Sequence, residues 1–136
     1  MTKMENQTAE GLNDISNLVD AVMKQKSAEG RDYYFMQKTE RETYYLDDSN
    51  NVLVHHARKE NGIIYLLEIE ETKGEKDICQ FSVYELNGQN TVKKVLGVFD
   101  DDANNSNKAQ ASKLFRRFRD AGNIKAELER YTKEPL

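Results

Sequence analysis

The sequence predicts an α+β domain: an N-terminal helix, an antiparallel meander of about six strands, and a C-terminal helix or helix pair. Apolar residues recur at helical spacing near both ends of the chain. Between these regions lie aromatic and β-branched runs that are separated by short polar connections. Connections of about three to five residues are too short for the crossover that a parallel strand pair needs, so the strands are expected to pair antiparallel.

The first predicted helix covers residues 8–29, with Thr8 as a cap and an end near Gly30. Its apolar stripe consists of Leu12, Ile15, Leu18, Val19, Val22 and Met23. This stripe has the spacing of a helix that packs on a sheet. The same spacing also fits the a and d positions of a two-stranded seam, so the 8–29 helix is also a candidate surface for a homodimer.

Six aromatic or β-branched runs predict the strands, at residues 32–36, 42–46, 52–57, 62–70, 78–86 and 92–99. Asn61-Gly62 and Asn87-Gly88 are strong hairpin signals, because both residues tolerate the positive φ angles of a two-residue turn. Two architectures accommodate this order. One is a strongly bent sheet or small barrel plugged by a helix, and the other is an open twisted sheet with the helices on one face.

Beyond Phe99, an acidic polar stretch leads into a helical region with the apolar stripe Ala111, Leu114, Phe115, Phe118 and Ala121. A weaker stripe of Ile124, Leu128 and Tyr131 predicts another helical segment after Gly122-Asn123. Residues 8–133 are therefore expected to form a single domain. Residues 1–7 are expected to be a flexible tail, and residues 134–136 a short C-terminal one.

Composition excludes several classes of protein. Of the 136 residues, 38% are apolar and 32% are charged, which predicts a thin core. A net charge of −4 gives no general attraction to nucleic acid or anionic lipid. No stretch approaches the roughly 20 apolar residues of a spanning helix, and the N-terminus lacks the apolar segment of a signal peptide. A cytoplasmic protein without membrane contact is expected.

No stretch carries a nucleophile elbow, a glycine-rich phosphate loop or a cofactor motif, so we expect no enzymatic activity, no cofactor and no metal. His55 and His56 are neighbours on a strand and point to opposite faces, which prevents them from holding one ion together. The acidic run 100–102 does not fit the calcium-loop template and is expected to be a solvated loop. The single cysteine, Cys79, is expected to be buried in its strand.

Glutamates alternate with apolar residues near the end of the fourth predicted strand. Glu68, Glu70 and Glu71 stand beside Leu67 and Ile69 in the sequence. Such an alternation is typical of a strand with one wet face, and these carboxylates are therefore expected to lie in solvent.

Positive charge is concentrated in the penultimate helical region, at Lys113, Arg116, Arg117 and Arg119. Because the apolar stripe should face the sheet, these side chains are expected to project outward. Arginine binds carboxylate and phosphate groups bidentately. An acidic protein partner, a nucleic-acid backbone and bulk solvent are all compatible with this pattern.

The chain has seven tyrosines and no tryptophan. Adjacent tyrosines on a strand place one ring on each face of the sheet, so some rings should face solvent. Tyr33, Tyr44 and Tyr45 are the candidates. Exposed rings anchor protein interfaces and also stack unpaired bases.

The leading hypothesis is a small non-enzymatic protein-binding module, acting as an adaptor, regulator or inhibitor. Its contact surface would combine the tyrosine-bearing sheet with the basic C-terminal helix. The alternative hypothesis is a single-stranded nucleic-acid-binding protein, in which the same tyrosines stack bases and the same arginines contact phosphates.

Overall fold

The computed structural model describes residues 3–74, 77–86, 91–100 and 106–133, and the side chains of residues 15–74, 77–86, 91–99 and 110–133. The first helix is α1 (Lys3–Ala28), and the strands are β1 (Tyr34–Lys38), β2 (Thr43–Leu46), β3 (Val52–Glu60), β4 (Ile63–Thr72), β5 (Ile78–Leu86) and β6 (Val92–Asp100). They are followed by α2 (Ser106–Asp120) and α3 (Ile124–Lys133). The predicted α+β class and the order of its elements are confirmed. The predicted hairpin at Asn87-Gly88 and most of the acidic run 100–102 lie outside the described residues.

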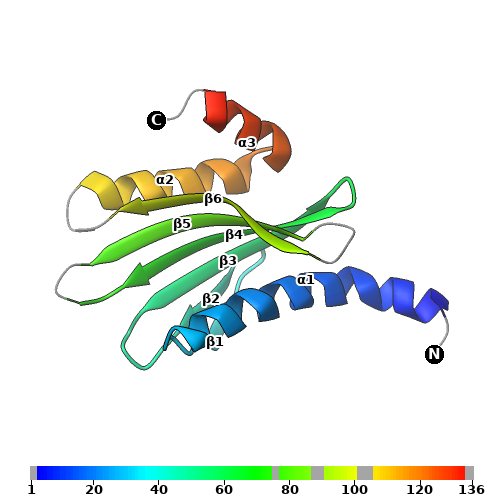
Figure 1. The fold of residues 1–136 in the computed structure, drawn as a ribbon, viewed down its shortest axis with the longest axis horizontal. Helices are drawn as coiled ribbons and strands as arrows, with labels where there is room; N and C mark the ends of the chain where they lie inside the picture. The colour runs from blue at the N-terminus through cyan, green and yellow to red at the C-terminus, as the bar shows by residue number, and fades with distance from the viewer. Residues whose placement is uncertain (1–2, 75–76, 87–90, 101–105, 134–136) are drawn as a thin grey trace.

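All six strands form one antiparallel sheet in the order β1-β2-β3-β4-β5-β6, so the chain is a meander with β1 and β6 at the edges. The sheet is open, which excludes the barrel alternative. Figure 1 shows α1 on one face of the sheet and α2 with α3 on the other. The expectation that an open sheet carries its helices on one face is therefore wrong.

The run Ile63–Leu67 explains why helices cover both faces. Five consecutive apolar residues cannot all face one side of a strand, because successive side chains alternate. Ile64 and Leu66 belong to the cluster packed under α1, whereas Tyr65 and Leu67 belong to the cluster packed under α2 and α3. The strand is buried on both faces, and each helix layer has its own core.

The core under α2 is the more aromatic of the two. Phe81 on β5 lies against Phe115 and Phe118 of α2, with ring centroids 6.3 and 5.3 Å apart. Tyr131 of α3 meets Phe118 edge-on at 6.5 Å. Cys79 is fully buried in the same core, as predicted.

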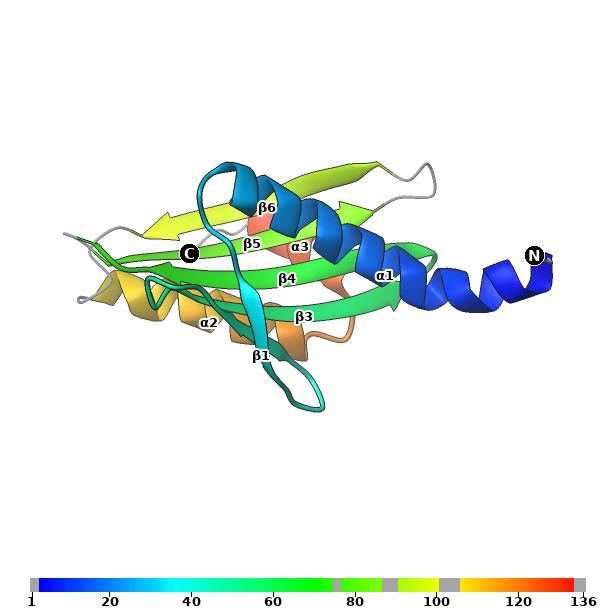
Figure 2. The ribbon, with the colours of Figure 1, turned by 90° about the horizontal axis from the view of Figure 1, so that it is seen from below.

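Helix α1 begins at Lys3, earlier than the expected start at Thr8, and its N-terminal part extends past the sheet (Figure 2). It ends in a Schellman motif around Gly30, which has a φ of 88°. The Arg31 amide donates to the Lys26 carbonyl and the Gly30 amide to the Ser27 carbonyl, both at 2.9 Å. This ending holds the C-terminal turn of α1 over the sheet.

The apolar stripe of α1 packs on its own sheet where its side chains are described. Leu18 and Val22 are buried there, and Ile15 and Val19 pack beside them. A homodimer through the 8–29 helix stays a prediction. The four residues named here are not available for its seam without leaving the sheet.

The hairpin between β3 and β4 turns on Asn61 and Gly62, whose φ angles are 50° and 83°. Positive φ costs a side-chain-bearing residue about 1–2 kcal/mol. No atom lies within 4 Å of a Cβ added to Gly62, so strain rather than a clash decides the outcome. We expect Gly62→Ala to lower the free energy of unfolding by about 1 kcal/mol in urea denaturation. Gly122→Ala is the control, because Gly122 has equal space without a positive φ; equal effects in both variants would contradict this explanation.

Candidate functional site

A cleft opens between α1 and the β1–β2 hairpin. Figure 2 shows this hairpin running across the direction of β3 and β4, on the side of the sheet that carries α1. One wall is formed by the α1 residues Ile15, Ser16, Val19 and Asp20. The other is formed by residues 38–43 of the hairpin, while Tyr45, His55, Ala57 and Leu66 form the floor. The volume is about 430 Å³. Cavities of about 300–1,000 Å³ are typical of small-molecule sites.

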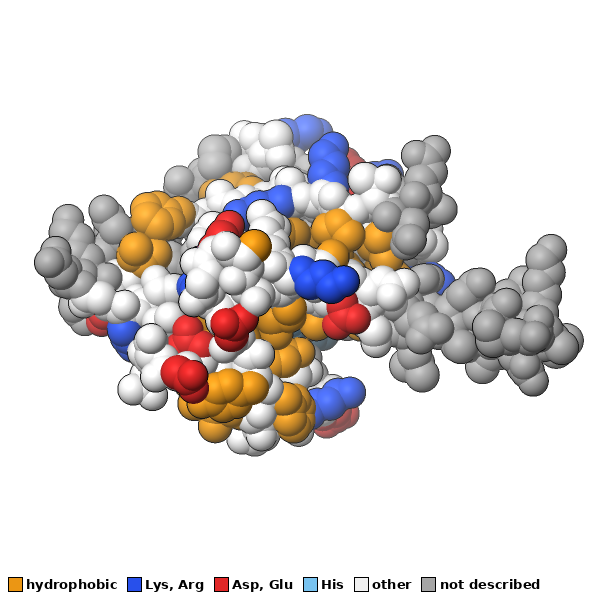
Figure 3. Space-filling view, turned by 60° about the horizontal axis from the view of Figure 1, so that its bottom comes forward, with side chains coloured by type: hydrophobic (Ala, Val, Ile, Leu, Met, Phe, Trp, Pro, Cys, Tyr) orange, Lys and Arg blue, Asp and Glu red, His pale blue; other side chains and the backbone are white. Residues whose placement is uncertain are grey.

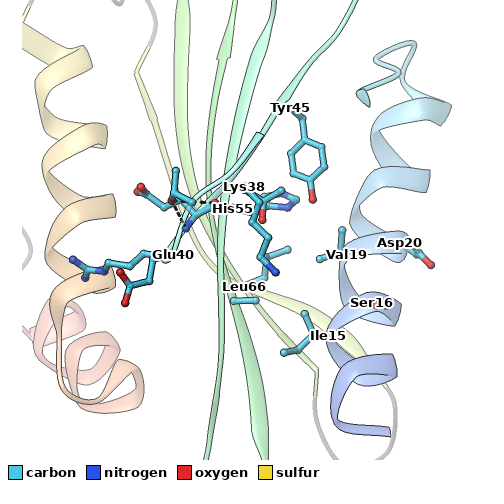
Figure 4. Close-up of a pocket in the computed structure, with 14 residues that line it drawn as sticks. Ile15, Ser16, Val19, Asp20, Lys38, Glu40, Tyr45, His55 and Leu66 are labelled. Carbon is cyan, nitrogen blue, oxygen red and sulfur yellow. Dashed lines mark hydrogen bonds between the residues drawn. The ribbon is translucent and has the colours of Figure 1, made fainter. Parts of the chain in front are cut away.

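The cleft combines apolar walls with few inward-pointing polar groups. Ile15, Val19 and Leu66 line the space below Tyr45 (Figure 4). Figure 4 shows the Lys38 side chain reaching into this space, with the Tyr45 hydroxyl directed toward it.

The acidic residues that line the cleft differ from Lys38, because they point outward or form an ion pair. The carboxylates of Asp20 and Glu40 point away from the cleft in Figure 4. Glu42 is bonded to Arg119 of α2, with 2.7 Å between Glu42 Oε2 and Arg119 Nη1. Arg41 forms an ion pair with Asp120. Lys38 has no ion-pair partner among the described residues, which makes it the unpaired charge that points into the cleft.

His55 lies at the floor of the cleft and is only 3% exposed. Its Nε2–H donates to Glu68 Oε2 at 2.8 Å, and the Tyr45 ring packs edge-on with centroids 5.1 Å apart. The other ring nitrogen, Nδ1, is buried and has no hydrogen-bond partner among the described residues. A buried polar atom without a partner costs free energy, so this nitrogen marks a place where a water molecule or a ligand would be stabilising.

Glu68 and Glu70 are buried beneath the end of α1, at 1% and 3% exposure, and the expectation that they lie in solvent is wrong. Lys26 Nζ lies 2.7 Å from Glu68 Oε1 and 3.1 Å from Glu70 Oε1. The Arg31 guanidinium adds a bond of 2.7 Å to Glu70 Oε2. The alternation correctly indicates a strand with two different faces. The face that was predicted to be in solvent is covered by α1. We call these residues, with His55, the buried charge network.

Opposite charges and hydrogen bonds determine the pKa of Glu68. Burial alone would raise it, but the hydrogen bond from His55, the His55 charge and the Lys26 ammonium together hold the pKa below its usual value. Burial raises the pKa of Tyr33, and the hydrogen bond that its hydroxyl donates to Glu70 at 2.7 Å raises it further. The network therefore keeps the Glu68 carboxylate charged beneath α1 at neutral pH.

The three predicted tyrosines make different contacts in the fold. Tyr33 is half-buried against Glu70, and Tyr45 lines the cleft. Tyr44 alternates with Tyr45 on β2, and its hydroxyl donates to Glu42 at 3.1 Å. A partner contact through these three tyrosines stays a prediction.

The exposed large apolar side chains lie instead on β1. Tyr34, Phe35 and Met36 are 51%, 61% and 52% exposed, and we call them the β1 patch. Figure 3 shows hydrophobic side chains at the lower edge of the molecule, where the β1–β2 hairpin lies. The first strand of an open meander lies at an edge of the sheet, so the apolar triplet of β1 carries the signal of this surface in the sequence.

The basic helix is divided between internal and exposed charges. Arg117 Nε is bonded to Glu127 Oε2 of α3 at 2.6 Å, and Arg119 Nη1 is bonded to Glu42, just before β2, at 2.7 Å. Lys113 and Arg116 are exposed, with no ion-pair partner among the described residues. Half of the predicted cluster therefore ties α2 to its neighbours in the fold.

Within the described ranges, no three potential metal ligands of the His, Cys, Asp and Glu type come together. The helices of that part of the chain are not long and apolar enough to cross a membrane. Comparison of the chain with protein-family models, with curated proteins and with solved structures gives no match.

Proposed function

We propose that this chain is a non-enzymatic protein-binding module that engages its partner through the β1 patch. The observation that carries the proposal is the exposure of three consecutive large apolar side chains, Tyr34, Phe35 and Met36, on an edge strand. Edge strands are ordinarily protected by charge, proline or brevity, because exposed apolar edges invite association. A patch of this kind on a small domain is typical of an interaction surface.

The side chains of β1 support binding better than its backbone does. The register between β1 and β2 shifts between Phe35 and Gln37, which leaves Met36 as a bulge. A bulge disturbs the regular spacing that an added strand needs. The partner is therefore expected to use Phe35 and Met36 as anchors in pockets of its own, as interface hot spots do.

The exposed half of the basic helix is the second part of the proposal. Lys113 and Arg116 project from α2 without ion pairs among the described residues. Rim charges mainly accelerate encounter with a partner of opposite sign. An acidic partner would therefore associate faster with this chain than a neutral one.

The single-stranded nucleic-acid hypothesis has less support. Tyr34 and Phe35 could stack bases, but Arg117 and Arg119 already hold Glu127 and Glu42. Phosphate contacts would depend on the remaining lysines and arginines. This reading predicts binding that weakens steeply with salt.

The proposal is tested by quantitative affinity capture from lysate with a matched pair of variants. Phe35→Ser with Met36→Ser should reduce the recovery of specific partner proteins by about tenfold or more, the loss expected for hot-spot anchors. Val92→Ser with Phe99→Ser on β6 is the control, since these side chains are also exposed and lie on the other edge. Equal recovery by both variants would overturn the β1 contact. Loss of all captured material after nuclease treatment would favour the nucleic-acid alternative.

A further inference from the structure

The geometry points to the cleft between α1 and the β1–β2 hairpin as a binding site for a small organic carboxylate with an apolar body. This inference is independent of the β1 patch. It rests on the shape of the cleft, on its unpaired positive charge and on the buried ring of His55.

The apolar part of such a ligand would lie along Ile15 and Val19 of α1 and against Leu66 of β4. These side chains line the cleft and belong to, or pack against, the core beneath α1. Their position is fixed by that packing, so the walls are formed before a ligand arrives. A preformed apolar wall favours binding because little conformational entropy is lost.

The charged end would lie toward Lys38 and Tyr45. The Lys38 side chain reaches into the cleft, and the Tyr45 hydroxyl points toward the same space (Figure 4). Both are hydrogen-bond donors, and neither has a bonded partner among the described residues. Asp20 and Glu40 point outward in Figure 4, and Lys38 is the charged group that reaches inward. Burial and, after it, the nearby Asp20 charge raise the pKa of Tyr45, so its hydroxyl keeps the proton that it would donate to a carboxylate.

The floor of the cleft contains a buried ring nitrogen of His55 that a ligand could engage. The ring is 3% exposed at the floor of the cleft, and its Nδ1 is buried without a partner among the described residues. The bond from Nε2–H to Glu68 fixes the orientation of the ring. A carboxylate above it, acting through a water molecule held against the ring, would give Nδ1 its missing partner.

The positive charge of Lys38 is expected to favour a carboxylate over other ligands that have the same apolar body. An alcohol of the same length would fill the apolar walls but would gain little from Lys38. An amine of the same length would be repelled by it. Affinity is therefore expected to fall from carboxylate to alcohol to amine.

Titration of the full chain with hexanoate, hexanol and hexylamine, followed by amide and methyl NMR shifts, tests the site. We expect hexanoate to bind with a Kd of about 1 mM, which ligand-efficiency limits allow for so small a molecule. The shifts should concentrate on Ile15, Val19 and Leu66. Hexanol should bind at least tenfold more weakly. Absence of saturation by about 10 mM hexanoate, or equal binding of the alcohol, would overturn the proposal.

Lys38→Met should weaken hexanoate binding about tenfold while leaving hexanol binding unchanged, since methionine keeps the apolar stem of the lysine and removes its ammonium group. Tyr45→Phe should weaken it about threefold, because one hydrogen bond is lost. Lys133→Met is the control, because it removes an exposed lysine from α3, on the other face of the sheet. Equal losses in Lys38→Met and Lys133→Met would mean that net charge, not the cleft, attracts the anion.

Discussion

Lys26→Met is expected to lower the free energy of unfolding by about 3–5 kcal/mol at neutral pH, the cost of removing one partner from a buried ion pair. Lys26 is 4% exposed, and its ammonium touches both Glu68 and Glu70. Methionine keeps the apolar stem but leaves two carboxylates close together under α1. Since domains of this size are stable by about 5–15 kcal/mol, urea denaturation should detect the loss easily.

The matched control is Lys24→Met, which removes an exposed lysine from the same helix and should change stability by less than about 0.5 kcal/mol. A second comparison tests the cause. In a background of Glu68→Gln and Glu70→Gln, Lys26→Met should cost much less, because no uncompensated carboxylate is left behind. A loss below about 1 kcal/mol in the wild-type background would show that the buried charge network does not hold α1 in place.

Much of the fold could be predicted from the sequence because its signals are local. The spacing of Leu18 and Val22, the alternation along the strands and the Asn61-Gly62 turn each act within a few residues. Because the short connections exclude parallel crossovers, each strand is expected to pair with the next one in the sequence, which gives a meander. The placement of helices on both faces was missed, although the consecutive apolar residues 63–67 carried its signal.

The candidate site was harder to predict because it depends on contacts between distant segments. Glu68 meets Lys26 across 42 residues, and nothing near Glu68 in the sequence distinguishes a buried carboxylate from a solvated one. Arg119 is similar, since its partner Glu42 is 77 residues away. A charge pattern shows which residues need compensation, but only the tertiary structure shows whether a partner or water provides it.

Glu68→Gln is expected to change the pH dependence of stability as well as its magnitude. The carboxylate of Glu68 accepts hydrogen bonds from His55 and Lys26, and its charge adds to burial in raising the pKa of Tyr84. Loss of the negative charge leaves Lys26 with only Glu70. At neutral pH the variant should be about 3 kcal/mol less stable than the wild type.

The sign of the pH effect follows from the lowered pKa of Glu68. A carboxyl group whose pKa is lower in the folded state than its usual value of 4.5 stabilises the fold fully above that value. This contribution disappears as the pH falls from 4.5 through the folded pKa, because the folded protein then has to take up a proton that it binds weakly. Glutamine has no such proton to take up. The stability difference between wild type and variant should therefore narrow steadily as the pH falls below about 4.5.

Urea denaturation at a series of pH values between neutral and acid measures that difference directly. Glu40→Gln is the control, because it removes an exposed glutamate that is not part of the buried charge network. A difference that stays constant below pH 4.5, or widens, would contradict a lowered pKa for Glu68. Narrowing in Glu68→Gln alone would identify this one carboxylate, held between α1 and β3, as a main source of acid sensitivity in the layer that also forms the floor of the cleft.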